Sequence, residues 1–216
     1  MLRSEIEFAS FLTYSVRGDG QPEQESRIWR DRLKHDRLFG SPPELTSQLI
    51  AEGLSRRLAE MPFVGYFGRG AVLVPVPSSS KLQKDGLWVP QRIARELVKV
   101  GLGDIVDTLL ERSRVLPKAA WSPARERPTA QQHYDSLGVT STGLAPARFV
   151  LIDDVITRGA TMLGAASRLG TAFPNAEIRC FAVMRSISEP LPFTNIFEPV
   201  VGKVELKSSG GTVRRP

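Results

Sequence analysis

The feature of this chain that most constrains its fold is an apolar run that leads directly into two acidic residues. Phe149–Ile152 is apolar throughout, Asp153 and Asp154 follow it, and a loop of small residues then ends in Gly159-Ala160-Thr161. An apolar run of this length, bounded by turn residues, predicts a buried strand of a parallel sheet. Open α/β sheets bind their ligands at the carboxyl ends of such strands. We therefore expect the two acidic residues to face a ligand.

A helix is expected directly after this loop, from Gly159 to about Leu169, because apolar residues recur there at near-helical spacing. The unpaired N–H groups and the partial positive charge of a helix N-terminus bind anions. Carboxylates can bind hydroxyl groups or a metal, and the backbone amides that follow can bind a phosphate. Together they predict a pocket for a sugar phosphate. The alternative is an ordinary strand-to-helix turn, but such a turn does not need two adjacent carboxylates that repel each other.

The rest of the chain alternates strand and helix patterns around this segment. The expected elements are a strand at Ala71–Pro77, a helix from Val89 or Pro90 to Val100, an extended stretch at Ile105–Leu110 and a strand at Glu177–Met184. This alternation, with right-handed crossovers, predicts an α/β fold with a mainly parallel sheet flanked by helices.

Both ends of the chain give weaker patterns, so we divide the sequence into segments 1–65, 66–189 and 190–216. The middle segment carries the α/β pattern. The expected local structures at the ends are helix-capable pieces at Glu5–Tyr14 and Arg27–Phe39, a capped helix at Ser41–Met61, an irregular stretch at Pro190–Gly202 and a flexible basic tail at Val213–Pro216.

Composition excludes several classes of protein. Lysine and arginine outnumber acidic residues by 29 to 23, and this net charge of +6 favours anionic small substrates or nucleic acid. Many of these cations, Lys34 among them, are expected on a solvated face. No apolar run approaches the ~18–20 residues of a membrane span, and the N-terminus is unlike a secretory signal. One cysteine and two histidines leave no disulfide framework and no zinc site. We expect a cytoplasmic protein without membrane contact.

Val150–Thr161 resembles the signature of type I phosphoribosyltransferases, which bind 5-phosphoribosyl-1-pyrophosphate (PRPP). In that family an apolar strand leads into two acidic residues and a Thr-x-Gly-x-Thr loop. The resemblance covers roughly Val72 to Arg185 and implies a Rossmann-like core with a variable hood formed by the termini. It implies that Asp153 and Asp154 hold the ribose hydroxyls. The residues that it assigns to the 5′-phosphate are Thr157, Arg158, Gly159, Ala160 and Thr161.

A second segment, Val74-Pro75-Val76-Pro77 followed by three serines and a lysine, lies where the family has its pyrophosphate loop. The sequence of this segment most resembles that of the ComF-like competence proteins, although this chain lacks their N-terminal cysteine-rich zinc element. The resemblance implies that Ser78, Ser79 and Lys81 bind the pyrophosphate. The alternative is a serine-rich surface turn.

The basic insertion Arg112–Arg127 falls where the family has its flexible catalytic loop, and the alternative is plain disorder. The resemblance implies that Arg114 and Lys118, with other cations of this insertion, close over the diphosphate as catalytic residues. Mg²⁺ is the expected cofactor, since it binds mainly through substrate phosphates. Asp153 and Asp154 could contact it, directly or through water. His35 and His133 are expected at the surface, without a catalytic role.

These features predict a Mg²⁺-dependent phosphoribosyltransferase that transfers phosphoribose from PRPP to a nucleobase or base-like acceptor and releases pyrophosphate. PRPP, this acceptor and a second copy in a homodimer are the expected partners. One alternative is a non-catalytic regulatory protein that binds PRPP or nucleotides, or associates with single-stranded DNA. Another is an enzyme that transfers phosphoribose to a macromolecule. The terminal segments would select the acceptor, and Trp88, Phe193 and Phe197 could stack on a base or simply belong to the core.

Overall fold

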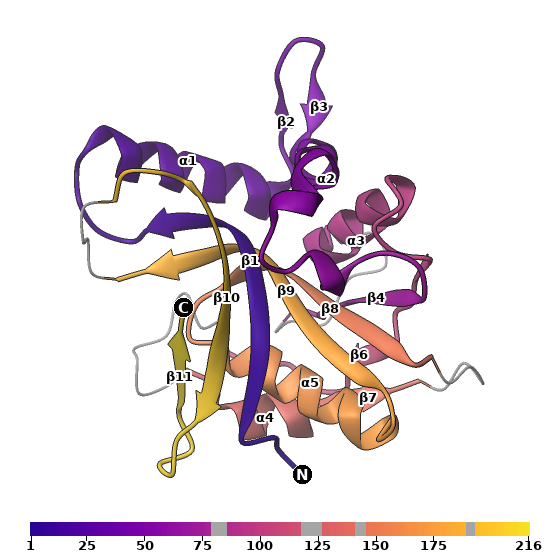
Figure 1. Cartoon of the computed structure of the whole chain (residues 1–216). Helices are drawn as coiled ribbons and strands as arrows, with labels where there is room; N and C mark the ends of the chain where they lie inside the picture. Colours follow the sequence, from indigo (N-terminus) through magenta and orange to yellow (C-terminus); the bar gives the residue numbers. More distant parts are fainter. Residues whose placement is uncertain (79–85, 118–126, 141–145, 189–192) are drawn as a thin grey trace.

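The computed structural model describes residues 1–78, 86–117, 127–140, 146–188 and 193–216, and a seven-stranded sheet runs through these ranges (Figure 1). The strand order is β11-β10-β1-β9-β8-β4-β5. The five strands β1, β9, β8, β4 and β5 are parallel to one another. At the other edge, β10 pairs antiparallel with β1, and β11 pairs antiparallel with β10. The seven strands are β1 (Glu5–Ser15), β4 (Ala71–Pro75), β5 (Ile105–Val106), β8 (Arg148–Ile156), β9 (Glu177–Ile187), β10 (Phe197–Leu206) and β11 (Thr212–Arg215).

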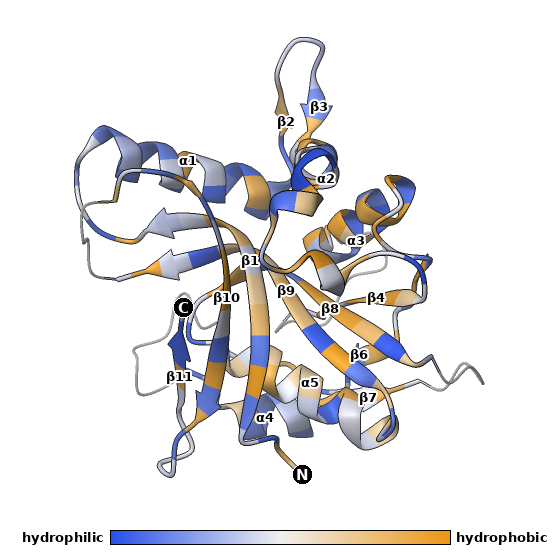
Figure 2. Ribbon diagram, in the orientation of Figure 1, coloured by the Kyte–Doolittle hydropathy of each residue, from blue (hydrophilic) through white to orange (hydrophobic). Residues whose placement is uncertain are grey.

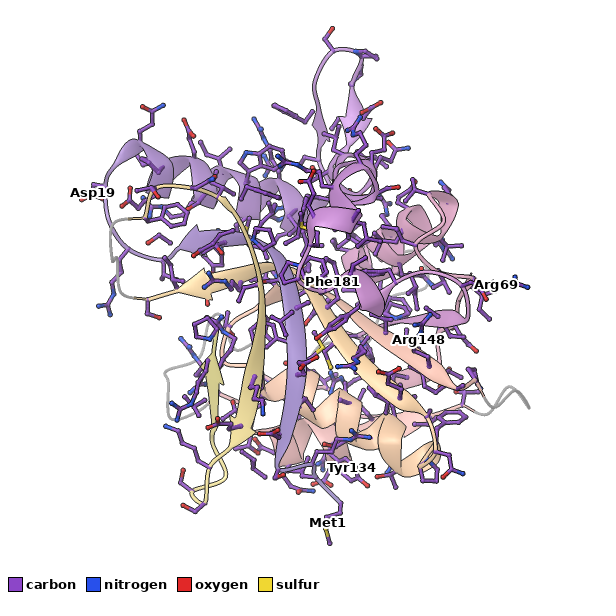
Figure 3. All side chains as sticks on the ribbon, in the orientation of Figure 1. Met1, Asp19, Arg69, Tyr134, Arg148 and Phe181 are labelled. Atoms are coloured by element: carbon purple, nitrogen blue, oxygen red, sulfur yellow. The ribbon has the colours of Figure 1, made fainter. Side chains whose placement is uncertain are left out.

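Helices cover both faces of this sheet and enclose two apolar cores (Figure 2). The first core lies against α1, α2 and α3, and includes Phe181 of β9 with Phe67, whose ring centroids are 5.1 Å apart (Figure 3). The second lies against α4 and α5. The mainly parallel sheet flanked by helices is therefore confirmed. The helices are α1 (Gln21–His35), α2 (Thr46–Arg57), α3 (Val89–Lys99), α4 (Ala130–Asp135) and α5 (Ala160–Ala172), with 3-10 turns at Leu58–Glu60 and Val64–Tyr66.

Two small two-stranded sheets complete the described part of the chain. The hairpin of β2 (Leu38–Phe39) and β3 (Glu44–Leu45) projects from the body beside α2 (Figure 1). The pair of β6 (Leu110–Arg112) and β7 (Leu137–Val139) lies beside α5. Within the described ranges, none of the helices has the length and apolarity that a membrane span needs.

The predicted helix at Glu5–Tyr14 is wrong, because this segment forms β1 inside the sheet. β1 pairs in parallel with β9 and antiparallel with β10, and Phe8 and Ala9 are fully buried. The apolar residues of this segment are interrupted by Glu7, Ser10 and Thr13 and follow neither the helical nor the strand period strictly, so periodicity does not assign it. Burial on both faces between two partner strands decides the matter in favour of a strand.

The predicted helix at Ser41–Met61 begins later than expected. Leu38 pairs with Leu45 in the hairpin, and Thr46 then donates its backbone N–H to the carbonyl of Arg37 over 3.0 Å. Pairing in the hairpin therefore uses the residues that the capping pattern assigned to the first helical turn, and α2 starts at Thr46. The other predicted helix of this region, at Arg27–Phe39, overlaps α1, which begins at Gln21 and ends at His35.

The C-terminal expectations are also corrected. Phe197 starts β10 inside the stretch predicted to be irregular, and the predicted flexible tail forms β11. β11 pairs antiparallel with β10 through a turn in which Gly210 has a φ of 81°. Strands of both terminal segments thus lie in the same sheet as the middle segment. Their role as a hood stays a prediction.

Replacing Phe8 by alanine should test the placement of β1. Phe8 is fully buried, so we expect Phe8→Ala to lower the free energy of unfolding by about 3–5 kcal/mol. Val16, next to β1, is 50% exposed, and Val16→Ala should stay within about 0.5 kcal/mol of the wild type. Urea denaturation measures both. A cost below about 1 kcal/mol for Phe8→Ala would contradict a central β1.

Candidate functional site

The loop between β8 and α5 has the geometry of an anion site. Gly159 precedes the helix in a left-handed conformation with a φ of 81°, and its carbonyl accepts the helical hydrogen bond from Leu163 over 2.9 Å. A Cβ atom at this position would overlap the side chain of Val204 on β10. Glycine is therefore required both by the backbone conformation and by the close approach of β10. The first amides of α5 point out of the helix end, as phosphate binding requires.

A narrow pocket lies over this loop, and only one of the two adjacent acidic residues lines it. The lining includes Asp153, His133 and Arg127 with residues 155–162. Side chains alternate along β8, so Leu151 belongs to the core against α5 and Ile152 to the core against α1 and α2. Asp153 continues the first row into the pocket. Asp154 continues the second row and lies beside α1.

Asp154 is nearly buried and forms an ion pair with Lys34 of α1. The Lys34 ammonium lies 2.8 Å from both carboxylate oxygens of Asp154. Burial lowers the pKa of Lys34, but the carboxylates of Asp154 and Asp153 outweigh it and hold the pKa above its ordinary value. The sequence analysis missed Lys34, because nothing in its local pattern separates it from the exposed cations around it.

Burial and the neighbouring Asp154 carboxylate raise the pKa of Asp153 to about 8. Burial and the adjacent carboxylate therefore both oppose ionisation of Asp153. One of its oxygens accepts a hydrogen bond from the backbone N–H of Asp154 over 2.9 Å. A half-buried carboxyl group that faces a pocket, with a strongly shifted pKa, is typical of a functional site.

His133 was expected at the surface, and this prediction is wrong. The side chain is 3% exposed, lines the pocket, and places Nε2 3.2 Å from Oγ1 of Thr161. Burial, with a contribution from the Arg112 guanidinium, lowers the pKa of His133 to about 4. The imidazole is therefore neutral at physiological pH. Its burial arises from the packing of α4 on α5, which the sequence pattern does not report.

Cations surround the loop between β8 and α5 on several sides. Arg127 lines the pocket, and the pKa of Arg158 is lowered by burial and by the nearby charge of Arg127. Arg214 of β11 donates through Nε to the carbonyl of Thr157 over 2.6 Å, and through Nη2 to the carbonyl of Ser186. Burial, then the charge of Arg185, lower the pKa of Arg214 to about 10. Like charges gathered around one loop favour an anionic ligand.

The end of β4, where the pyrophosphate loop is expected, is held by Arg112. Its guanidinium donates to the carbonyls of Pro77 and Ser78 over 3.1 and 3.0 Å, and to Oγ of Ser136. Burial lowers the pKa of Arg112 to about 10. Arg112 therefore binds the protein backbone as part of the β6–β7 pair.

The structure brings Asp153 and Thr157–Thr161 together in one pocket and adds His133 and Arg127 to it. Asp154 lies toward α1, Ser78 lies beside Arg112, and Arg114 is exposed after β6. Ser79, Lys81 and Lys118 lie outside the described residues. The functional roles of all these residues stay predictions.

The carboxylates at this site could supply only a minority of the oxygen ligands that a Mg²⁺ ion needs. Among the described residues, no group of three or more acidic, histidine or cysteine side chains could hold a metal ion. Asp153, however, presents a carboxyl group to the pocket. Such a site fits an ion that is held mostly by phosphate oxygens and water, with one protein carboxylate.

The aromatic candidates for base stacking have contacts within the fold. Trp88 donates its indole N–H to the carbonyl of Val76 over 2.9 Å, and Phe193 is 7% exposed. Phe197 packs edge-on against Phe11, and the Arg57 guanidinium lies 4.2 Å from its ring centroid. Trp88 and Phe197 therefore contribute contacts to the fold, and Phe193 is buried.

Several solved structures of phosphoribosyltransferases are similar to this chain. Adenine phosphoribosyltransferase from Leishmania tarentolae is 15% identical, with 79% of this chain and 90% of that chain covered and a TM-score of 0.34. Hypoxanthine phosphoribosyltransferase from Staphylococcus aureus is 11% identical, with 75% of this chain and 82% of that chain covered and a TM-score of 0.39. Adenine phosphoribosyltransferase from Trypanosoma brucei, solved with AMP, pyrophosphate and ribose-5-phosphate, is 14% identical. The match covers 80% of this chain and 83% of that chain, with a TM-score of 0.36. No family model and no curated protein sequence matches the chain. The functional conclusion therefore rests on the residues of the site.

The depressed pKa of His133 predicts how this residue contributes to stability. The unfolded chain takes up the proton near pH 6.5, and the folded chain only near pH 4. Stability from the neutral imidazole is therefore present above pH 6.5 and is lost as the pH falls toward 4, by about 3 kcal/mol at most. The gap in unfolding free energy between the wild type and His133→Gln should close over this range. An imidazole that titrates near pH 6.5 in NMR spectra would contradict the buried position.

A substitution at Gly159 should damage the loop, whereas the same substitution on a helix surface should not. Gly159→Ala combines a left-handed backbone, which costs about 1–2 kcal/mol, with an overlap on Val204. Gly53 lies in α2 with open space around it, so Gly53→Ala should stabilise the protein by about 0.5–1 kcal/mol. Thermal unfolding of both variants measures the contrast. Equal effects would show that the loop tolerates a side chain.

Proposed function

We propose that this protein is a Mg²⁺-dependent phosphoribosyltransferase that binds PRPP and transfers its phosphoribosyl group to a nucleobase or base-like acceptor. The observation that carries the proposal is the pocket itself. It combines a carboxyl group, Asp153, with a glycine loop and a helix N-terminus at Thr157–Thr161. A carboxyl group for ribose hydroxyls next to amides for a phosphate matches the two ends of ribose 5-phosphate.

In the proposed reaction the bond between C1 of ribose and the diphosphate oxygen breaks, and a bond between C1 and a nitrogen of the acceptor forms. No nucleophile from the protein is needed. The loop amides and the hydroxyls of Thr157 and Thr161 would hold the 5′-phosphate, and Asp153 would accept hydrogen bonds from the ribose hydroxyls. Rate then comes from fixed positions and from neutralised charge on the leaving group. Mg²⁺, when bound, supplies part of that neutralisation.

The remaining residues would act around this centre. Asp154, kept in place by Lys34, would fix the other side of the ribose or contact the metal through water. Ser78, Ser79 and Lys81 would bind the pyrophosphate, and Arg112 supports this part of the proposal because it holds the carbonyls of Pro77 and Ser78. Arg114 and Lys118 would approach the leaving group from the basic insertion and exclude water.

A second candidate function is a non-catalytic PRPP- or nucleotide-binding regulator that associates with single-stranded DNA. One observation favours it. A groove of about 650 Å³ between α1 and the β2–β3 hairpin is lined by three arginines and one acidic residue, with apolar Ile28 and Leu38 beside them. The charged residues are Arg27, Arg32, Arg37 and Asp31, which pairs with Arg37. Cationic grooves with apolar walls suit single strands. Release of pyrophosphate in the presence of a base supports the enzyme, whereas steeply salt-dependent DNA binding without turnover supports the regulator.

Binding of PRPP tests the proposed function. In calorimetric titrations with PRPP and Mg²⁺, Asp153→Asn should weaken binding about 10- to 100-fold. The amide replaces one acceptor oxygen by an NH₂ donor and removes the charge, and a lost hydrogen bond to a charged group costs about 1–3 kcal/mol. Asp19→Asn is the matched control, because Asp19 is exposed in the loop before α1 (Figure 3), and it should bind as the wild type does. No binding at millimolar PRPP, or unchanged binding by Asp153→Asn, would overturn the proposal.

A further inference from the structure

A buried side-chain contact joins α4 to Thr157–Thr161, the proposed phosphate loop. His133 of α4 places Nε2 3.2 Å from Oγ1 of Thr161, which lies in the first turn of α5. The two helices approach closely because Gly164 faces α4, where a Cβ atom would come within 2.6 Å of the His133 Cβ and 2.7 Å of the Ala130 carbonyl oxygen. The helix contact therefore fixes the imidazole against the threonine that the phosphate loop contributes.

The other ring nitrogen decides which group donates in this contact. Nδ1 of His133 is buried and has no hydrogen-bond partner among the described residues. If Thr161 donated to Nε2, the single N–H of the neutral ring would be on Nδ1 and would remain unpaired inside the protein. A buried N–H without a partner is rarer than an underused acceptor, and its loss costs a full hydrogen bond. The proton is therefore on Nε2, and the ring donates to Thr161.

This direction leaves the Thr161 hydroxyl hydrogen free. A hydroxyl that accepts from Nε2 must donate elsewhere, and the pocket is lined by both His133 and Thr161. A donor that points into the pocket suits a phosphate oxygen, whereas a lone pair in its place would repel it. We infer that His133 is a positioning residue that orients the Thr161 hydroxyl as a hydrogen-bond donor toward a bound phosphate. This inference rests on the proposed phosphate site.

The surroundings of His133 hold the ring in this orientation. Thr129 caps α4, with its Oγ1 accepting from the backbone N–H of Gln132 over 3.2 Å. The carbonyl of His133 accepts from Oγ of Ser136 over 2.9 Å, and that oxygen in turn accepts from Arg112. A short helix fixed at both ends can keep one tautomer in place. Through Ser136, α4 also connects the proposed phosphate loop to Arg112 of β6, which holds the carbonyls of Pro77 and Ser78 after β4.

Two isosteric amides test the inference, because glutamine reaches the position of Nε2 and asparagine reaches only that of Nδ1. The probe is ribose 5-phosphate, measured by calorimetry. His133→Gln should bind within about threefold of the wild type, and His133→Asn should bind about tenfold more weakly, the effect of one hydrogen bond of ~1.4 kcal/mol. Equal affinities for the two variants and the wild type would overturn the role of His133.

The threonine supplies a second control. In a Thr161→Val background, replacing His133 by asparagine should cause no further loss, because the oriented hydroxyl is already absent. An additive loss would indicate a structural effect of His133 and would overturn the inference. If the wild type itself does not bind ribose 5-phosphate, the proposed function fails first, so the two failures are distinguishable.

NMR of the unmodified protein tests the tautomer without any variant that must fold. Nitrogen-15 shifts of the imidazole should identify a protonated Nε2 and a bare Nδ1 at neutral pH, before and after inorganic phosphate is added. A proton on Nδ1 in the presence of phosphate would overturn the inference.

Discussion

The alternation of side chains along β8 is the constraint on which the site depends. β8 lies between β9 and β4 and is buried on both faces, so successive residues must enter different cores. When the apolar residues end, the same alternation continues through Asp153 and Asp154. One carboxyl group is thereby directed into the pocket and the other toward α1. Two acidic residues that are adjacent in sequence thus meet different surroundings, and this difference separates their chemistry.

Lys34 compensates the charge that this alternation buries. A carboxylate as enclosed as Asp154 is costly without a partner, and the ammonium on α1 provides one. The pair also ties α1 to the end of the central strand. The N-terminal segment therefore contributes a strand, β1, to the sheet and a cation to the site. Asp153, which lines the pocket, and Asp154, which lies beside α1, therefore have different side-chain surroundings.

Local patterns predicted the elements whose signal is contained within a few neighbouring residues. The apolar run Phe149–Ile152, the Gly159 turn and the helix at Val89–Lys99 combine hydrophobic patterns with turn or cap residues. The turn and the helix lie near their predicted positions, and β8 contains the predicted run but continues through both acidic residues to Ile156. β1, β11 and the burial of His133 could not be predicted in this way. Each depends on a partner far away in the sequence: β1 on β9 and β10, β11 on β10, and His133 on Gly164.

The hydrogen bond from Arg214 to Thr157 has a consequence for the order in which the molecule is assembled. β11 follows every other strand of the sheet in the chain. Among the described strands it pairs with β10 alone, and β10 itself pairs with β1. Arg214 thus contacts the loop between β8 and α5 from a strand that belongs to the sheet through the pairing of the two terminal segments. Contacts of such high sequence separation form slowly. A nascent chain that still lacks β11 carries the signature residues before Arg214 can contact Thr157.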